Sequence, residues 1–383
     1  MTPGARAAAA IAVLDRYLAG EPVERALTNW GRASRFAGSG DRAAVRDLVF
    51  DALRCKRSYA ALGGAMTGRG LILGGVRASG GDGGDLFTGE GHAPVKVGPD
   101  EIGRRPVGAE ALDVPDWLLP ELEASLGDAT VPVLRAMQVR APVFLRVNLR
   151  KTTVAQALAR LAGEEIAATP HPLAKTALEV TGNARKIQTS ESFRTGLVEL
   201  QDASSQAVVE ALPLRDGIRV LDHCAGGGGK TLAMAALARI KVWAHDANPR
   251  RMADLPERAR RAGVAVTLTE APETLAPFDL VLVDAPCSGS GSWRRDPEGK
   301  WALTEARLAE VVAVQAGIMT RAATMVGPGG TLAYATCSLL EKENEAQVNA
   351  FVTAHPGWTV QSKQRFLPTS GGDGFFVALL TRA

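Results

Sequence analysis

The sequence predicts an α/β protein whose C-terminal half forms a mainly parallel sheet covered by helices on both faces. A small α+β module and an N-terminal helical domain precede that sheet. Two observations carry this prediction. From about residue 216 onward, short β-branched runs alternate with helical segments, which is typical of parallel sheets. The first of these runs leads into four consecutive glycines, and ligands of such sheets bind at the carboxyl ends of the strands.

The composition indicates a globular protein without a membrane span, a disulfide framework or a metal site. In 383 residues, 46% are hydrophobic, which allows a sizeable core in two or three domains. No uncharged apolar run approaches the roughly 18 residues that a membrane span needs. The first residues superficially resemble a signal peptide, but Asp15 and Arg16 follow at once, so we expect a cytoplasmic protein. The 4 cysteines and 5 histidines are scattered, so we expect no metal site. We also expect the protein to be a monomer.

Residues 1–135 form the predicted helical domain. Apolar residues recur at helical spacing over residues 11–18 and 45–53, and Asp41 is a candidate N-cap for the second helix. A glycine-rich stretch over about 63–110 predicts a long connection with short ordered pieces, whose exposed parts should be mobile. Helical patterning returns over about 114–137.

Residues 136–200 form the predicted α+β module, with strands over 143–148 and 177–180 and a helix over 154–161. Residues 201–383 form the main α/β domain. We expect its strands over 218–222, 242–246, 265–268, 280–284, 331–336 and 375–380, and its helices over 230–240, 250–262, 304–325 and 343–355.

The glycine loop that follows the first strand is a candidate ligand site. Glycines let a ligand approach the backbone, and the next helix offers free N–H groups. A P-loop is an alternative because Gly229, Lys230 and Thr231 match its last three residues, but Cys224 stands where that motif needs a glycine. The next strand ends at Asp246, a position suited to binding ribose hydroxyls.

Two cysteines lie at the ends of two predicted strands. Cys287 follows the strand that ends at Asp284, and Cys337 follows the next strand along the sheet. Neighbouring parallel strands would bring both thiols together beside Asp284. Most lone cysteines are buried hydrophobes, but two at neighbouring strand ends indicate reactive thiols.

Several segments resemble the RNA 5-methylcytosine methyltransferases of the RsmB/NOP2/NSUN family. The resemblance covers about residues 112–383, and the N-terminal helices are loosely similar to the NusB-like domain of the bacterial rRNA branch. The matching segments are Cys224-Ala225 with Gly228-Gly229-Lys230-Thr231, Asp284-Ala285-Pro286-Cys287-Ser288-Gly289, and Tyr334-Ala335-Thr336-Cys337-Ser338.

The resemblance implies a Rossmann-like class I methyltransferase domain that uses S-adenosylmethionine. It implies that Cys337 attacks carbon 6 of cytosine, that Cys287 assists product release, and that Asp284 contacts N3 of the base. Cys287 is the alternative nucleophile. The residues implied to bind the cofactor are Cys224, Ala225, Gly226, Gly227, Gly228, Gly229, Lys230, Asp246, Glu270 and Asp284. Gly226 and Gly227 replace the usual Ala-Pro of the family, which predicts a more flexible loop.

We expect RNA as the partner, with 16S ribosomal RNA first and tRNA second. The candidate RNA contacts are Arg146, Asn148, Arg294, Arg295 and Lys300. Two other classes of function stay open, namely a P-loop-like NTPase and a non-catalytic RNA-binding ribosome assembly factor.

Overall fold

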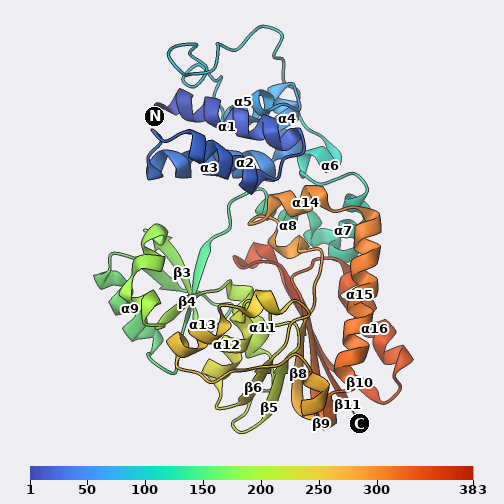
Figure 1. The fold of residues 1–383 in the computed structure, drawn as a ribbon. Coiled ribbons are helices and arrows are strands. Elements are labelled where there is room, and N and C mark those ends of the chain that lie inside the picture. Colours follow the sequence, from blue (N-terminus) through green and yellow to red (C-terminus); the bar gives the residue numbers. More distant parts are fainter. Residues whose placement is uncertain (383) are drawn as a thin grey trace. The chain divides into compact units, whose positions relative to one another are not determined.

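The computed structural model describes residues 1–382, which form two compact units (Figure 1). The first unit contains Met1–Arg140 together with Trp293–Ala302. The second unit contains Ala141–Ser292 and the chain from Leu303 onward. The chain forms two compact units, so the division into three domains stays a prediction. Within the described chain, no helix is long and apolar enough to cross a membrane.

The first unit is helical. Its helices are α1 (Pro3–Leu18), α2 (Val23–Ala33), α3 (Ser39–Arg54), α4 (Lys56–Gly63), α5 (Gly68–Ala78), α6 (Gly108–Ala111), α7 (Leu118–Leu126), η1 (Gly127–Ala129), α8 (Thr130–Met137) and α14 (Pro297–Ala302). The helices expected over residues 11–18 and 45–53 are confirmed within α1 and α3. Asp41 is not the N-cap of α3, because Gly38 holds that position and the Asp41 carboxylate accepts from the Gly38 N–H at 3.3 Å.

The connection predicted over residues 63–110, with only short ordered pieces, contains the 11-residue helix α5 in its first part. Leu71 and Leu73 of this helix are fully buried in the core of the first unit. Glycines are needed here because α5 packs closely against α4. A Cβ on Gly74 would lie 1.9 Å from the Tyr59 carbonyl oxygen of α4, and one on Gly70 would lie 2.1 Å from that of Ala65, just after α4. Residues 79–107 contain no helix or strand, in agreement with the rest of the prediction.

The second unit contains two sheets. The smaller has the strand order β2-β3-β1-β4, with every pair antiparallel, and is accompanied by α9 (Val154–Gly163), η2 (Ala184–Thr189) and α10 (Glu191–Arg194). Its strands are β1 (Val143–Val147), β2 (Ala167–Pro170), β3 (Ala177–Gly182) and β4 (Val198–Leu200). The expected strands over 143–148 and 177–180 and the helix over 154–161 are confirmed, whereas the two short edge strands were not predicted.

The larger sheet has seven strands in the order β10-β11-β9-β8-β5-β6-β7 (Figure 1). The pairs from β9 to β7 are parallel, and β11 runs antiparallel to β9 and β10. The strands are β5 (Arg219–Asp222), β6 (Lys241–Ala244), β7 (Thr267–Leu268), β8 (Phe278–Asp284), β9 (Val326–Thr336), β10 (Trp358–Phe366) and β11 (Phe375–Arg382). This sheet confirms the predicted Rossmann-like α/β fold. All six predicted strands are present, and only the edge strand β10 was missed.

Helices cover both faces of this sheet. They are α11 (Ala203–Glu210), α12 (Gly229–Leu237), α13 (Leu255–Ala262), α15 (Glu305–Ala323) and α16 (Glu345–Ala354), with the short turns η3 (Pro249–Met252), η4 (Pro272–Leu275), η5 (Ser290–Ser292), η6 (Glu341–Glu343) and η7 (Pro368–Ser370). Successive residues of the central strand β8 enter different cores. Leu280 and Leu282 pack with Met234 of α12, whereas Val281 and Val283 pack with Met319 of α15. The strand is therefore buried on both faces, which explains its uninterrupted apolar run.

Candidate active site

The loop between β5 and α12 forms one wall of a cavity at the carboxyl ends of the strands. Gly226 and Gly228 have φ of 52° and 79°, in the left-handed region that favours glycine. Gly228 is the N-cap of α12, and its conformation turns the chain into that helix. The predicted ligand loop is thus an open turn that ends at a helix N-terminus, where backbone N–H groups are available.

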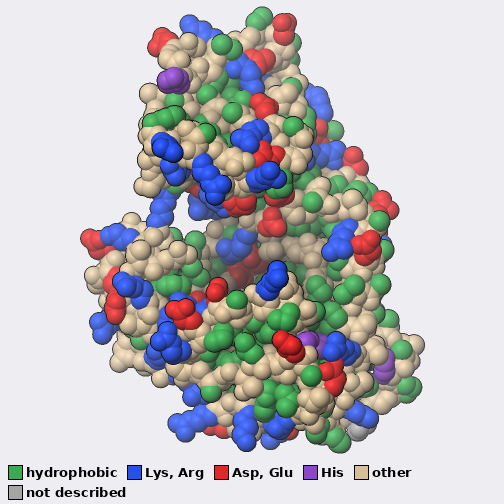
Figure 2. All heavy atoms as spheres, in the orientation of Figure 1, with side chains coloured by type: hydrophobic (Ala, Val, Ile, Leu, Met, Phe, Trp, Pro, Cys, Tyr) green, Lys and Arg blue, Asp and Glu red, His purple; other side chains and the backbone are tan. Residues whose placement is uncertain are grey.

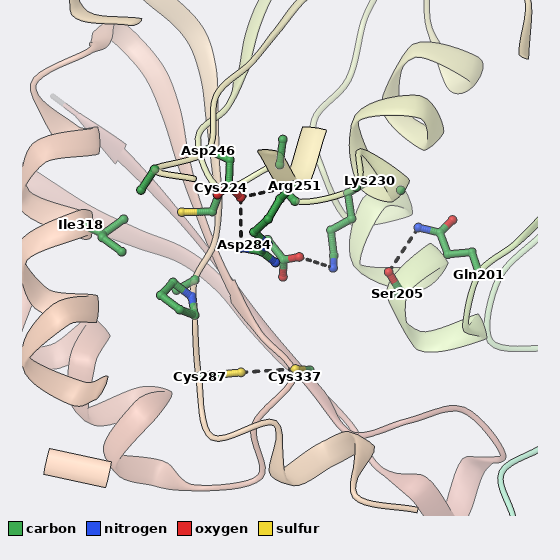
Figure 3. Close-up of a pocket in the computed structure, with 17 residues that line it drawn as sticks. Gln201, Ser205, Cys224, Lys230, Asp246, Arg251, Asp284, Cys287, Ile318 and Cys337 are labelled. Carbon is green, nitrogen blue, oxygen red and sulfur yellow. Dashed lines mark hydrogen bonds and ion pairs between the residues drawn. The ribbon is translucent and has the colours of Figure 1, made fainter. Parts of the chain in front are cut away.

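The cavity has a volume of about 580 Å³ and lies within the second unit (Figure 3). It brings together most of the residues that the sequence singled out. Its lining residues are Gln201, Ser205, Cys224, Ala225, Gly226, Gly227, Gly229, Lys230, Asp246, Ala247, Arg251, Asp284, Ala285, Pro286, Cys287, Ile318 and Cys337. Among residues 1–382, no group of three or more His, Cys, Asp or Glu side chains is arranged to hold a metal ion.

Asp246 holds the glycine loop at the end of β6. Its Oδ2 accepts from the Gly226 N–H at 2.9 Å, and its Oδ1 accepts from the Asn248 N–H at 2.9 Å. Arg251 contacts the same carboxylate, with Nη1 at 3.1 Å from Oδ2. Asp246 is only 4% exposed but faces the cavity, so its oxygens can accept hydrogen bonds from ligand hydroxyls.

Lys230 and Asp284 form an ion pair across the cavity, with Nζ 2.6 Å from Oδ2 (Figure 3). The ammonium also lies 4.8 Å from the centre of the Phe375 ring. Burial disfavours the charged form of Lys230, but the charge of Asp284, their hydrogen bond and the nearby Cys337 together raise the pKa of Lys230. The lysine is therefore a fixed positive charge at this end of the cavity.

Cys287 and Cys337 face each other, with their sulfur atoms 3.2 Å apart (Figure 3). They follow β8 and β9, which are parallel neighbours with Asp284 paired opposite Ala335. The sequence prediction that these thiols lie side by side near Asp284 agrees with this geometry. The hydrogen bond with Cys337, burial, and the charges of Cys337 and Glu343 raise the pKa of Cys287 well above its ordinary value.

Asp222 supports the loop from beneath the cavity. It is 1% exposed, and its Oδ2 accepts from the Thr231 hydroxyl at 2.6 Å. Burial raises its pKa to about 7, and the negative charge of Asp284 acts in the same direction. Its hydrogen bond ties the end of β5 to the first turn of α12.

Glu270 does not take part in the cavity. Its side chain is exposed and is not among the lining residues. The strand β7 that precedes it has only two residues, and both are exposed. Conversely, Gln201, Arg251 and Ile318 line the cavity without having been predicted, because they lie outside the strand ends and glycine loop that the sequence arguments searched.

The predicted RNA contacts are mostly buried, which corrects the expectation of an exposed basic surface. The Arg146 guanidinium donates to the Gly229 carbonyl at 2.8 Å, and the Asn148 amide donates to that of Ala262 at 2.8 Å. Lys300 donates to the Arg54 carbonyl at 3.0 Å, and burial lowers its pKa to about 8. Arg294 is also buried, and only Arg295 has an exposed side chain. Within the first unit, Lys300 donates to the carbonyl of Arg54, and the Arg294 carbonyl accepts from the Arg54 guanidinium.

The fold and the site together define a Rossmann-like α/β methyltransferase domain. Residues 209–381 match the family model described as 16S rRNA methyltransferase RsmB/F, and residues 114–187 match that of the RsmF/B-like ferredoxin-like domain. The chain belongs to the RsmB/F methyltransferase family. S-adenosylmethionine is accordingly its cofactor. This membership leaves the P-loop alternative without support.

Curated relatives and solved structures agree with this family. The chain is 34% identical over 284 residues to the ribosomal RNA small subunit methyltransferase B of Yersinia pestis bv. Antiqua, strain Angola. The match covers 70% of the chain and 66% of the relative, slightly less than two thirds of its length. The relative from Yersinia pseudotuberculosis serotype O:1b matches equally, with 34% identity.

Among solved structures, PH0851 has a TM-score of 0.77 with 23% identity, covering 100% of this chain and 99% of that one. A methyltransferase homolog protein from Pyrococcus horikoshii has a TM-score of 0.64 with 25% identity, covering 72% and 97%. Both likenesses show a shared fold, and the likeness to PH0851 covers both units of the chain.

Proposed function

We propose that this protein transfers a methyl group from S-adenosylmethionine to carbon 5 of a cytosine in RNA. The observation that carries the proposal is the pair of thiols 3.2 Å apart in the wall of the cofactor cavity, beside the Lys230–Asp284 ion pair. The names of the relatives favour small-subunit ribosomal RNA as the substrate. The second candidate substrate is tRNA. Assembly of the ribosome would place this reaction in the cytoplasm.

The residues of the cavity suit the cofactor. S-adenosylmethionine supplies an electrophilic methyl group when it is bound. Asp246 offers a carboxylate to the ribose hydroxyls, and the loop from Cys224 to Lys230 offers backbone groups at a helix N-terminus. Arg251 contacts the same Asp246 carboxylate. The ribose hydroxyls would either displace Arg251 from that carboxylate or bind it together with Arg251.

Carbon 5 of cytosine is too electron-poor to take a methyl group directly. Attack of the Cys337 sulfur on carbon 6 forms a covalent bond and gives carbon 5 the character of an enamine. Lys230 lies near Cys337, whose charge is among the causes that raise the pKa of the lysine, so a positive charge stands beside the attacking sulfur. Asp284, once it has taken up a proton, would donate that proton in a hydrogen bond to N3 of the base and so offset the negative charge that builds there during the attack.

Cys287 is suited to the release step. It accepts the proton of carbon 5, and the electrons of that C–H bond restore the C5–C6 double bond while the Cys337–C6 bond breaks. The hydrogen bond and charge of Cys337 are among the causes that raise the pKa of Cys287. Both disappear once Cys337 is bound to carbon 6, so Cys287 ionises more readily when the base is needed.

The proposal is tested with labelled S-adenosylmethionine and small-subunit RNA that lacks its own modification, followed by mapping of 5-methylcytosine. The variant Cys337→Ala should give neither product nor covalent complex. The variant Cys287→Ala should accumulate a protein–RNA adduct that withstands denaturation. The opposite behaviour of the two variants would reverse the roles of the cysteines, and methylation at another atom would refute the proposed chemistry.

A further inference from the structure

A buried carboxylate lies directly behind the two cysteines. Glu343 is the last residue of η6, and its exposed fraction is 0%. It does not line the cofactor cavity, so it has no access to a ligand there. A fully buried glutamate is costly unless hydrogen bonds compensate its charge, and its partners therefore indicate why it is kept.

Both oxygens of Glu343 accept hydrogen bonds from residues next to the cysteines. Oε1 accepts from the Ser288 N–H at 2.7 Å, and Oε2 accepts from the Ser288 hydroxyl at 2.5 Å. The Ser338 hydroxyl also donates to Oε2. Since Ser288 follows Cys287 and Ser338 follows Cys337, one carboxylate joins the two loops that carry the thiols.

Gln315 extends this network to the other side of Cys287. Its Nε2 donates to Glu343 Oε1 at 3.1 Å and to the Pro286 carbonyl at 2.9 Å. Gln315 is itself fully buried in α15. The Pro286 carbonyl before Cys287 is thus held by Gln315, and the Ser288 N–H after Cys287 is held by Glu343.

The turn that carries Glu343 is also fixed. The Tyr334 hydroxyl donates to the Glu343 carbonyl at 2.6 Å, and the Asn344 amide donates to the Ser338 carbonyl at 2.9 Å. Hydrogen bonds to an ionised acceptor are stronger than neutral ones. The carboxylate is consequently a rigid junction between the ends of β8 and β9.

We propose that Glu343 is a positioning residue that holds the sulfur atoms of Cys287 and Cys337 face to face, so that both can act on one pyrimidine ring. This inference rests on the proposed function for its catalytic meaning, but the geometry it describes is testable without RNA or cofactor. Loss of the junction would let the loops separate, and a misplacement of about 1 Å lowers the rate of an oriented reaction by roughly 100-fold.

The first test measures the thiol geometry with phenylarsine oxide. This arsenical closes a ring with two facing thiols, forming two As–S bonds and releasing one water. The other cysteines come from other segments: Cys55 is buried in the first unit, and Cys224 lines the same cavity from the loop after β5. We expect stoichiometric binding by the unmodified protein, no stable binding by Cys337→Ala, and about tenfold weaker binding by Glu343→Gln.

The second test measures methylation. Glu343→Gln should lower kcat by roughly 100-fold while KM for S-adenosylmethionine changes less than about twofold, because the side chain does not contact the cavity. The matched control is Glu345→Gln, two residues along the chain from Glu343. It changes a glutamate whose Oε1 accepts from Arg365 Nε at 2.6 Å. That control should bind the arsenical and turn over like the unmodified protein.

Ser288→Ala provides a second variant if Glu343→Gln does not fold. It removes one donor to Oε2 but keeps the backbone N–H bond, so both arsenical binding and kcat should fall by a smaller factor. If Glu343→Gln folds and binds the arsenical normally, the inference is overturned. If Glu343→Gln does not fold, normal binding by Ser288→Ala overturns it. If arsenical binding falls as expected while the unmodified protein methylates no cytosine carbon 5, the positioning role stands and the proposed function fails.

Discussion

Lys230 Nζ lies 2.6 Å from Asp284 Oδ2, so the helix that follows the glycine loop is joined by an ion pair to the strand that leads to Cys287. Both side chains are mostly shielded from water, and electrostatic interactions are stronger where water is excluded. It places a positive charge near Cys337 and orients the carboxylate expected to contact the base.

Replacing Lys230 should therefore slow chemistry more than it weakens binding. Lys230→Gln removes the positive charge near Cys337 and frees Asp284 to move. We expect kcat for methylation to fall by roughly 100-fold, because loss of a preorganised charge that stabilises the transition state has an effect of this size. Lys241→Gln, at an exposed lysine of β6, is the control and should react normally. A large rise in KM with unchanged kcat would contradict this role.

Asp246→Asn should weaken cofactor binding. The substitution removes the charge from an acceptor that also holds the Gly226 N–H, and hydrogen bonds to charged groups contribute about 1.5–3 kcal/mol. The dissociation constant for S-adenosylmethionine, measured by calorimetry, should rise by roughly 10- to 100-fold. Exposed Asp254→Asn should leave binding unchanged. Equal affinities of the two variants would exclude Asp246 from the site.

Gly226 and Gly227 should differ in their tolerance of alanine. Gly226 has φ of 52°, and a Cβ there would lie 3.0 Å from Arg251 Nη2. Gly227 lacks a positive φ, and its Cβ would meet the flexible end of Arg258 at 3.2 Å. A left-handed alanine costs about 1–2 kcal/mol, so Gly226→Ala should reduce cofactor affinity more than Gly227→Ala. Titration of both variants checks the order, and the reverse order would show that Arg258 governs the loop.

Asp222 should make stability depend on pH. Its pKa is raised from 3.8 to about 7 in the folded protein, so the folded state keeps a proton that the unfolded chain releases. The associated stability is complete at pH below 3.8 and is lost as pH rises to about 7.

We expect Asp222→Asn to remove this loss. Urea unfolding should show the variant gaining stability relative to the unmodified protein between about pH 4 and about pH 8. Exposed Asp254→Asn should follow the unmodified protein over the same range. A constant difference between Asp222→Asn and the unmodified protein would mean that Asp222 does not titrate in the folded state.

The sequence was informative wherever burial gives a strand a continuous apolar run. The central strands β5, β8 and β9 were predicted for this reason, whereas β10 was missed because most of its side chains are exposed at the edge of the sheet. Helix α5 was missed because its glycines, which usually weaken a helix, serve close packing with α4. Local propensity does not register such tertiary contacts.

The site was predictable only where the chemistry is concentrated at strand ends. Asp246, Asp284, Cys287 and Cys337 could be found because parallel strands bring their carboxyl ends together. Glu343 could not, because its partners on the two cysteine loops become visible only in three dimensions. The same limit explains the error at Lys300, whose charge suggested an exposed contact but whose partner is a carbonyl of α3.

Basic side chains are dispersed over the visible faces of both units, among acidic ones (Figure 2). This distribution agrees with a net charge of only +3. Recognition of RNA by such surfaces would depend on shape and on a few oriented groups more than on a broad electropositive field.

The segment Trp293–Ala302 interrupts one folding unit and belongs to the other. Its Trp301 indole donates to the Leu53 carbonyl at 2.7 Å, and Trp293 is 2% exposed. A single cut in the chain therefore cannot separate the two units cleanly. Chimeras that exchange the helical unit between relatives must transplant this ten-residue insert along with the N-terminal helices, or an unpartnered tryptophan would be left to promote aggregation.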